Sequence, residues 1–282
     1  MKTGMNLLLW TDHVTEALDP VLDQLKGLGF DAVEVPMFRT DADAMRDYER
    51  LGKRLKSLGL RATGVTVMGP EANPISPEKS IRDAAVAHLD RVMECGQAFG
   101  CEILCGPTHS AIGVFSNQPP TETEFKHGVE TLQRAGEKAQ ARKMMIATEY
   151  LNRFEIYFLT TAAQCARFVD AVNHPNVRMM YDSFHANIEE KDQARAIASC
   201  KNQFIHVHVS ENDRGTPGTG GVNWHSFWSG LKDVNYDGFV TIEAFGRALP
   251  ALAAATKVWR DLFDDPMSLC KDGLAFIHKN TR

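Results

Sequence analysis

Side chains that can bind metal ions or transfer protons stand at the ends of four successive apolar segments in the second half of the chain. MMIATEY carries Glu149, VRMMYDSF carries Asp182, FIHVHVS carries His206 and His208, and VTIEAF carries Glu243. Carboxylates and imidazoles can hold a divalent cation or act as general acid and base. Whether these side chains meet in space depends on the elements that position them.

Short apolar runs alternate with longer amphipathic segments along the whole chain. The predicted strands are residues 5–10, 32–37, 61–68, 102–107, 144–150, 177–184, 204–210 and 240–245. Predicted helices between them include residues 43–58, 77–99, 122–142, 162–172 and 224–234. This alternation predicts a (β/α)8 TIM barrel of the α/β class, one domain over residues 1–282. A doubly wound open sheet is the alternative, disfavoured because no GxGxxG follows the first strand.

Strand periodicity indicates which of these side chains face the barrel interior. In a TIM barrel, chemistry occurs at the C-terminal ends of the strands. Successive side chains alternate between the two faces of a strand, which predicts that Phe204, His206 and His208 point inward. The same alternation turns Glu149 and Glu243 inward. The strand between them is mixed on both faces, so its pattern does not orient its acid.

Three carboxylates and an imidazole in one apolar cup predict a bound divalent cation. No Lys or Arg stands on these four strand ends, so the carboxylates would repel each other and be poorly solvated. For any one of these residues alone, an isolated buried group or an ion pair at the rim is the alternative. Mainly oxygen ligands favour Mn²⁺, Mg²⁺ or Co²⁺ over a thiolate zinc site. We expect Glu34 to orient a ligand, and His206 to hydrogen-bond behind His208 rather than bind metal.

Composition excludes several classes of partner. The 282 residues are 44% hydrophobic and carry a net charge of −5, which gives no basic surface for nucleic acid. No apolar stretch approaches the ~20 residues of a membrane span, and the six-residue apolar run near the N-terminus is short for a signal peptide. The six cysteines form no CxxC pair and are expected to be reduced thiols, so we predict a cytoplasmic protein.

Four segments resemble the signature blocks of a known family. EYLNRFE (149–155), YDSFHANIEE (181–190), HVHVSENDRG (206–215) and IEAFGR (242–247) are similar to those of the ketose 3-epimerases. This family includes the D-tagatose, D-psicose and L-ribulose 3-epimerases, within the xylose-isomerase-like TIM barrel superfamily. SPEKSIRDAAVAHLDR (76–91) and TKVWRDLF (256–263) resemble further stretches, so the similarity covers nearly the whole chain.

The resemblance implies a role for seven residues. The implied metal ligands are Glu149, Asp182, His208 and Glu243. Glu149 and Glu243 are also the implied acid and base. The implied substrate-binding residues, which hold the carbonyl end and hydroxyls of a ketose, are Glu155, His185 and Arg214. For Glu155, a surface ion pair with Arg153 is the alternative.

The implied activity is a metal-dependent epimerisation of ketoses at carbon 3 through a cis-enediolate. Mn²⁺ is the favoured cofactor, with Co²⁺ or Mg²⁺ as alternatives. The implied partners are a ketose, free or phosphorylated, and further copies of the chain in a homodimer or homotetramer. Two other functions stay open: an aldose–ketose isomerase of the hydroxypyruvate isomerase type, and a sugar-binding relative without activity. An apurinic endonuclease-like phosphodiesterase is disfavoured because a histidine-rich metal cluster and a basic face are lacking.

Several departures from the family pattern leave the sugar undetermined. Asn6 stands inward on the first strand, where the family often has an aromatic residue, and residues 105–113 fall where substrate contacts vary. Ser183 replaces a common threonine. Residues 210–224 contain four glycines and are expected to form a mobile rim loop that carries Arg214.

Overall fold

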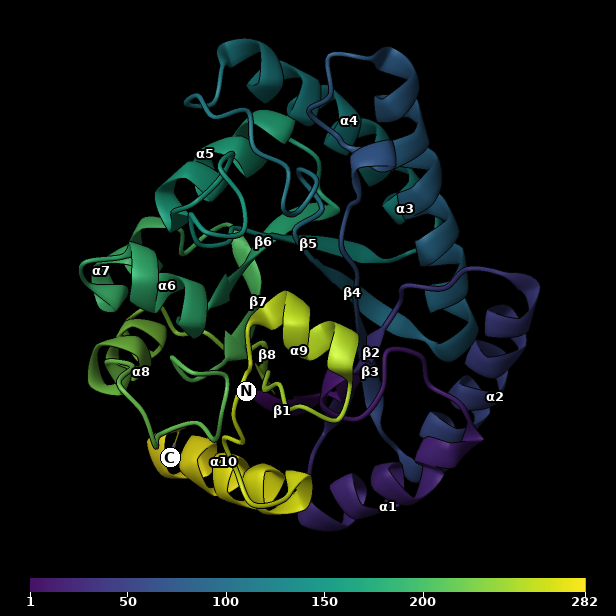
Figure 1. The fold of residues 1–282 in the computed structure, drawn as a ribbon, viewed down its shortest axis with the longest axis vertical. Coiled ribbons are helices and arrows are strands. Elements are labelled where there is room, and N and C mark those ends of the chain that lie inside the picture. The colour runs from purple at the N-terminus through teal and green to yellow at the C-terminus, as the bar shows by residue number, and fades with distance from the viewer. Residues whose placement is uncertain (282) are drawn as a thin grey trace.

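The strands form a closed parallel barrel. A computed structural model describes residues 1–281, in which each strand pairs with the next and β8 pairs with β1. The strands are β1 (Lys2–Asn6), β2 (Ala32–Pro36), β3 (Arg61–Val65), β4 (Cys101–Gly106), β5 (Met145–Glu149), β6 (Val177–Asp182), β7 (Phe204–Val209) and β8 (Phe239–Ile242). Figure 1 shows helices surrounding this barrel. The predicted single-domain TIM barrel is confirmed.

Helices link successive strands around the barrel, and the last two helices follow β8. The α-helices are α1 (Asp19–Leu28), α2 (Ala42–Leu58), α3 (Lys79–Phe99), α4 (Glu122–Ala141), α5 (Ala162–Val172), α6 (Ser183–Glu189), α7 (Gln193–Ser199), α8 (Trp224–Asp233), α9 (Pro250–Thr256) and α10 (Pro266–Thr281). The 3-10 helices are η1 (Leu7–Leu9), η2 (Glu16–Leu18) and η3 (Pro70–Ala72). In Figure 1, α9 lies across the barrel near β8 and β1.

Local sequence signals explain where α2 starts and stops. Asp41 caps its N-terminus by accepting hydrogen bonds from the backbone of Asp43 and Ala44. Gly59 ends it with φ of 63°, a left-handed conformation that glycine adopts without strain. The chain can then enter β3 two residues later.

The hydrophobic core consists of two clusters, one between the strands and the helices and one inside the barrel. Ala147 and Met180 belong to the interior cluster, on the same faces as Glu149 and Asp182. The predicted inward direction of Glu149 in β5 and of Glu243 after β8 is confirmed. Asp182 of β6, whose direction the sequence pattern left open, also points inward. The inward prediction for Phe204 is wrong, because the pairing register of β6 and β7 shifts there. Phe204 instead packs in the helix-facing cluster and stacks on Tyr236 at 5.0 Å.

The start of the barrel differs most from the prediction. The first strand is Lys2–Asn6, and the apolar run Leu7–Leu9 forms a 3-10 helix instead of a strand. The Asn6 side chain causes this turn, since its Oδ1 accepts from the backbone N–H of Leu8 at 2.9 Å. The five predicted helices are confirmed with small shifts at their ends. Within residues 1–281 no helix combines the length and apolar character that a bilayer crossing needs.

Candidate active site

The strand ends bring the predicted acidic and imidazole side chains to one rim. Glu149 and Asp182 are the last residues of β5 and β6, His208 lies in β7, and Glu243 directly follows β8. All four side chains are buried. His208 Nδ1 lies 3.6 Å from Asp182 Oδ2 and 3.4 Å from Glu243 Oε1.

Two overlapping groups of side chains are close enough to hold a cation. One consists of Asp182, His208 and Glu243, and the other of Glu149, Asp182 and His185. Together they contain every predicted ligand, and they share Asp182. His185, predicted to bind substrate, is the additional member.

Two buried atoms at this centre find no hydrogen-bond partner within residues 1–281. They are Glu149 Oε1 and His208 Nδ1. Leaving a buried polar atom unpaired costs about 1–3 kcal/mol, so such atoms call for an explanation. Both belong to the predicted metal ligands, and a divalent cation would satisfy both. The donor set therefore fits a metal ion.

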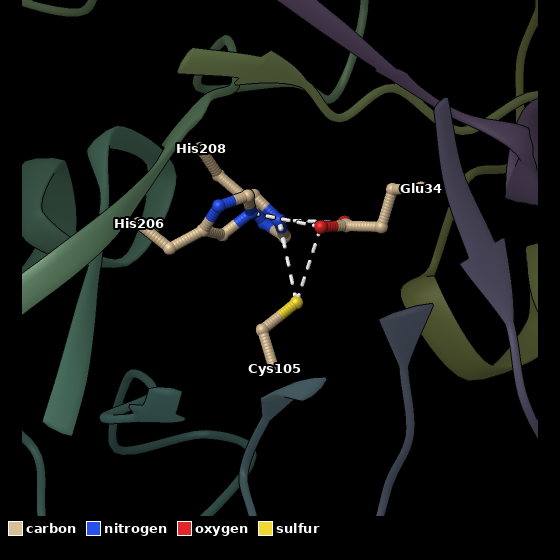
Figure 2. Close-up of side chains that lie close together, drawn as sticks. All are labelled: Glu34, Cys105, His206 and His208. Carbon is tan, nitrogen blue, oxygen red and sulfur yellow. Dashed lines mark hydrogen bonds and ion pairs between the residues drawn. The ribbon is translucent and has the colours of Figure 1, made fainter. Parts of the chain in front are cut away.

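Glu34 fixes the orientation of His208 from below. Figure 2 shows Glu34, Cys105, His206 and His208 converging inside the barrel. His208 Nε2 lies 2.7 Å from Glu34 Oε1, and His206 Nε2 lies 2.8 Å from Glu34 Oε2. The hydrogen bond to His208 agrees with the expectation for Glu34. His206 lies beside Glu34 behind His208, but neither of its ring nitrogens makes a hydrogen bond within residues 1–281, so the hydrogen bond expected of His206 is not found. With Nε2 bonded to Glu34, the other nitrogen of His208 is directed at Asp182 and Glu243, as expected for a metal-binding histidine.

The four side chains in Figure 2 are themselves spaced for metal binding, but Glu34 is already saturated. Its oxygens accept hydrogen bonds from Asn6 Nδ2 at 3.0 Å, Thr63 Oγ1 at 2.9 Å and Cys105 Sγ at 3.2 Å, in addition to His208. We interpret this cluster as the support of the rim site. Burial opposes ionisation of Glu34, but His208 and His206 outweigh it and hold the pKa of this carboxyl well below its usual range.

Arg214 supplies a positive charge that the strand ends lack. Its Nη1 donates to Glu243 Oε2 at 2.5 Å and to Asp182 Oδ2 at 3.3 Å. The guanidinium lies 3.6 Å from the ring centre of Phe184 and 4.9 Å from that of Phe245. The expectation of three uncompensated carboxylates is therefore wrong, because the loop after β7 reaches back over the rim. The unpaired atoms remain as the structural ground for a cation.

The loop that carries Arg214 is folded around one carboxylate. Glu211 is buried and accepts from the backbone of Gly218 at 2.8 Å and of Val222 at 3.1 Å, and from Trp224 Nε1 at 2.9 Å. Arg214 has a left-handed φ of 67°, and its N–H donates to the carbonyl of Glu211 at 2.9 Å. Glu211 thus orders the four-glycine segment and directs Arg214 inward.

Asn152 holds the two other predicted substrate-binding residues. Its backbone N–H donates to His185 Nδ1 at 3.1 Å, and its Nδ2 donates to Glu155 Oε1 at 2.7 Å. His185 Nδ1 faces two donors of Asn152, so the neutral ring carries its hydrogen on Nε2. This nitrogen lies 3.7 Å from Glu149 Oε1 and 3.3 Å from Arg214 Nη2, which cannot accept a hydrogen bond from it. Burial lowers the pKa of His185 to about 3, so this ring is neutral at pH 7.

The alternative of an ion pair between Glu155 and Arg153 is wrong. Arg153 instead pairs with Glu189, with Nη2 2.8 Å from Oε2. Glu190, the next residue, accepts from the backbone N–H of Ala162 at 2.8 Å at the start of α5. The acidic end of the YDSFHANIEE segment therefore fixes the loop after β5. Glu155 is not paired with Arg153.

The environments of Glu149 and Glu243 push their pKa values apart. Burial raises the pKa of Glu149 well above its usual range, and the charges of Asp182 and Glu243 add to this. Burial also opposes ionisation of Glu243, but His208 and Arg214 lower its pKa below the usual value. Two carboxyl groups with opposed pKa shifts are the usual arrangement of an acid and a base in one site.

Sequence reasoning missed three supporting residues. Asn152 lies inside the EYLNRFE block, so its position in a motif was a usable signal. Asn6 donates to Glu243 Oε1 at 3.2 Å as well as to Glu34. His109 Nε2 lies 2.9 Å from the carbonyl oxygen of Glu149 and supports that strand end. Nothing in the local sequence of His109 indicates this contact, which depends on the β4–β5 pairing.

Five of the polar side chains described above face one small cavity at the C-terminal rim. The cavity has a volume of ≈ 220 Å³ and is lined by Glu149, Glu155, His185, Arg214 and Glu243 on its polar side. The predicted catalytic and substrate-binding residues thus share one cavity. Asp182 and His208 lie beneath it, at the metal-binding groups.

Comparison with known proteins shows that the chain is similar to sugar epimerases. Residues 22–267 match the family model of the xylose isomerase-like TIM barrel. The chain is similar to a probable ketose 3-epimerase of Synechocystis sp., with 29% identity over 99% of this chain and 96% of the relative. It is 30% identical to a D-psicose 3-epimerase of Agrobacterium fabrum over 93% of this chain and 91% of the relative.

A solved structure extends the similarity to three dimensions. The D-allulose 3-epimerase from Methylomonas sp., in complex with D-allulose, superposes with a TM-score of 0.92 at 26% identity. The match covers 99% of this chain and 97% of that one. The likeness therefore includes the strand ends that carry the site.

Proposed function

Because this chain belongs to the ketose 3-epimerases of the xylose isomerase-like TIM barrel family, we propose that it epimerises ketoses at carbon 3 with Glu149 and Glu243 as acid and base. One observation carries the proposal. These two carboxyl groups face the same cavity, and their pKa values are shifted in opposite directions. One can therefore accept a proton while the other donates one.

We assign the metal to Glu149, Asp182, His208 and Glu243. The unpaired atoms of Glu149 and His208 support this assignment. Three carboxylates and one imidazole favour Mn²⁺, with Co²⁺ or Mg²⁺ as alternatives. When bound, the cation supplies a Lewis acid that stabilises negative charge on a cis-enediolate. A carboxyl group has two oxygens, so one oxygen of Glu149 would hold the cation while the other carries the proton that Glu149 donates.

The chain's own residues then handle the proton at carbon 3. In one direction the ionised Glu243 accepts that proton, while the protonated Glu149 donates one to the opposite face of the carbon. In the other direction the roles reverse. Glu155, His185 and Arg214 bind the carbonyl end and its hydroxyls, with His185 donating from Nε2 and Arg214 from its guanidinium. Burial of the cluster limits access of water to the intermediate.

The main competing activity is an aldose–ketose isomerisation, which would use the same enediolate. Turnover in deuterated water separates the two. Deuterium only at carbon 3 of a recovered ketose supports epimerisation, and deuterium at carbon 1 or 2 supports isomerisation. A sugar-binding protein without activity would give no label, and the presence of both Glu149 and Glu243 speaks against it.

The direct test is Glu243→Gln with Mn²⁺ present. We expect the variant to fold and to lose about 10²- to 10⁴-fold in kcat, because an amide cannot accept the proton. Glu102→Gln is the matched control, since Glu102 lies at the start of β4, away from the strand ends, and should leave kcat unchanged. Near-normal turnover in Glu243→Gln would refute the acid–base assignment.

We also propose a homodimer or homotetramer. Large apolar side chains support this, since Phe154 is 75% exposed and Trp259 is 67% exposed. Sedimentation equilibrium of the whole chain measures the state, and a monomer at all concentrations would contradict the proposal. A cytoplasmic location likewise remains a proposal, supported by six free, buried cysteines.

A further inference from the structure

The two halves of the barrel contribute opposite surfaces to the cavity. All five charged or imidazole groups that line it lie at the end of β5 or in the segments that follow β5 to β8. The half built from β1 to β4 contributes only apolar residues: Leu8, Phe38, Val65, Val67, Pro107 and Ile112. A substrate whose reacting carbons lie at the carboxylates therefore extends its far end toward an apolar wall.

The roof of the cavity offers no additional side-chain donor. It is formed by α9, through Leu252, Ala255 and Thr256. The hydroxyl of Thr256 already donates to the carbonyl oxygen of Leu252 at 2.8 Å within the helix. A hydroxyl group at the far end of a sugar would thus meet apolar side chains on both sides.

The cavity also lacks a group for a phosphate. Arg214 is the one Lys or Arg that lines it within residues 1–281, and it is already paired with Glu243 and Asp182. At the apolar end, the phosphate group of a sugar phosphate would contact apolar side chains and have no cationic partner, which is strongly unfavourable. The volume of ≈ 220 Å³ is below the ~300–1,000 Å³ of sites for larger ligands, so one small sugar fits better than a glycoside.

We infer that the substrate is an unphosphorylated ketose whose far end is deoxygenated, such as a 6-deoxyketohexose with a terminal methyl group. The inference rests on the proposed function, which places carbons 1 to 3 at the polar side. A methyl group gains from contact with Val67 and Ile112, whereas a hydroxyl there finds no side-chain partner.

The test compares matched sugars on the whole chain with Mn²⁺. Each set consists of a D- or L-ketohexose, its 6-deoxy derivative and its 6-phosphate. An apolar pocket discriminates against one added hydroxyl by about 10- to 100-fold, so we expect kcat/KM for the best 6-deoxyketose to exceed that of its parent by this factor. The 6-phosphate should be the poorest of each set.

A variant pair tests the wall itself. Val67→Thr adds a hydroxyl to the cavity with little change of shape, and should lower the preference for the 6-deoxyketose severalfold. Val114→Thr is the matched control, because Val114 is also 36% exposed but does not line the cavity, and it should leave the preference unchanged. Equal effects of both variants would overturn the role of the wall.

Binding separates failure of this inference from failure of the proposed function. Calorimetric titration with the same sugars and Mn²⁺ reports on the cavity without turnover. Tighter binding of 6-deoxyketoses without any epimerisation would support the cavity and refute the 3-epimerase proposal. Epimerisation in which the parent ketose or its phosphate is the best substrate would refute the cavity inference alone. No binding of any of these sugars would overturn the cavity inference.

Discussion

Glu34→Gln tests whether the support beneath His208 sets metal affinity. The carboxylate accepts four side-chain hydrogen bonds, the shortest at 2.7 Å from His208. In the variant the amide nitrogen can face Thr63 and Cys105, whose hydroxyl and thiol can rotate, and the amide oxygen can still accept from His208. The geometry then survives while the negative charge is lost.

The expected loss of metal affinity follows from this loss of negative charge. Removing an outer carboxylate typically weakens metal binding by about 10- to 100-fold. Because the hydrogen bond to His208 is retained, we expect the lower end, about tenfold or ~1.4 kcal/mol. We expect the free energy of unfolding to fall by about 1–3 kcal/mol, since donors near the new amide lose an acceptor.

The assay is a titration with Mn²⁺ in which free ion is followed by electron paramagnetic resonance, alongside urea unfolding of the metal-free protein. Asp31→Asn is the control, as Asp31 accepts two hydrogen bonds from Thr3 near the start of β1 and touches no proposed ligand. The control should lose stability and keep its Mn²⁺ affinity. If both variants bind Mn²⁺ as the parent does, Glu34 does not act through His208, and our explanation fails.

Three further outcomes are expected. Asn152→Ala releases Glu155 and His185, so steady-state kinetics should show kcat/KM lowered about tenfold, while the Mn²⁺ titration stays unchanged; a weaker metal site would contradict this. Burial lowers the pKa of His109 to about 4, below the ~6.5 of an unfolded histidine. The unfolded state thus takes up a proton first as pH falls. The free energy of unfolding therefore decreases by about 3 kcal/mol between pH ~6.5 and pH ~4. Urea unfolding across this range should show a shallower fall in His109→Asn, and parallel curves would refute the assignment. Removal of metal by a chelator should abolish turnover but leave the circular dichroism spectrum unchanged, with activity restored by added Mn²⁺.

Sequence periodicity predicts the rim residues because barrel strands are regular over short distances. Glu149 and Glu243 follow apolar alternation that persists to the strand ends, so their direction can be read without a partner strand. Phe204 cannot be placed in this way, because the register shift that turns it depends on how β7 pairs with β6. The end of β1 is mispredicted for a related reason, since Leu7–Leu9 is as apolar as a strand and only the side chain of Asn6 marks the turn.

Contacts made from loops are the least predictable part of the site. Arg214 lies outside the strands, and its inward direction depends on the folding of its loop around Glu211. The family resemblance names Arg214 as a substrate-binding residue, but it does not indicate that the guanidinium pairs with Glu243 and Asp182. Periodicity carries no information on a residue whose backbone is irregular.

The asymmetry between the two catalytic carboxyl groups arises from these unpredicted neighbours. Glu243 accepts from Arg214 and Asn6, whereas Glu149 Oε1 finds no hydrogen-bond donor within residues 1–281. Donors stabilise the ionised form, and their lack favours the protonated form. Asn6 also bonds Glu34, so the first strand joins the support of His208 to the base that we propose. A change at Asn6 should therefore alter both metal affinity and the pH dependence of turnover, although Asn6 is neither a ligand nor an acid.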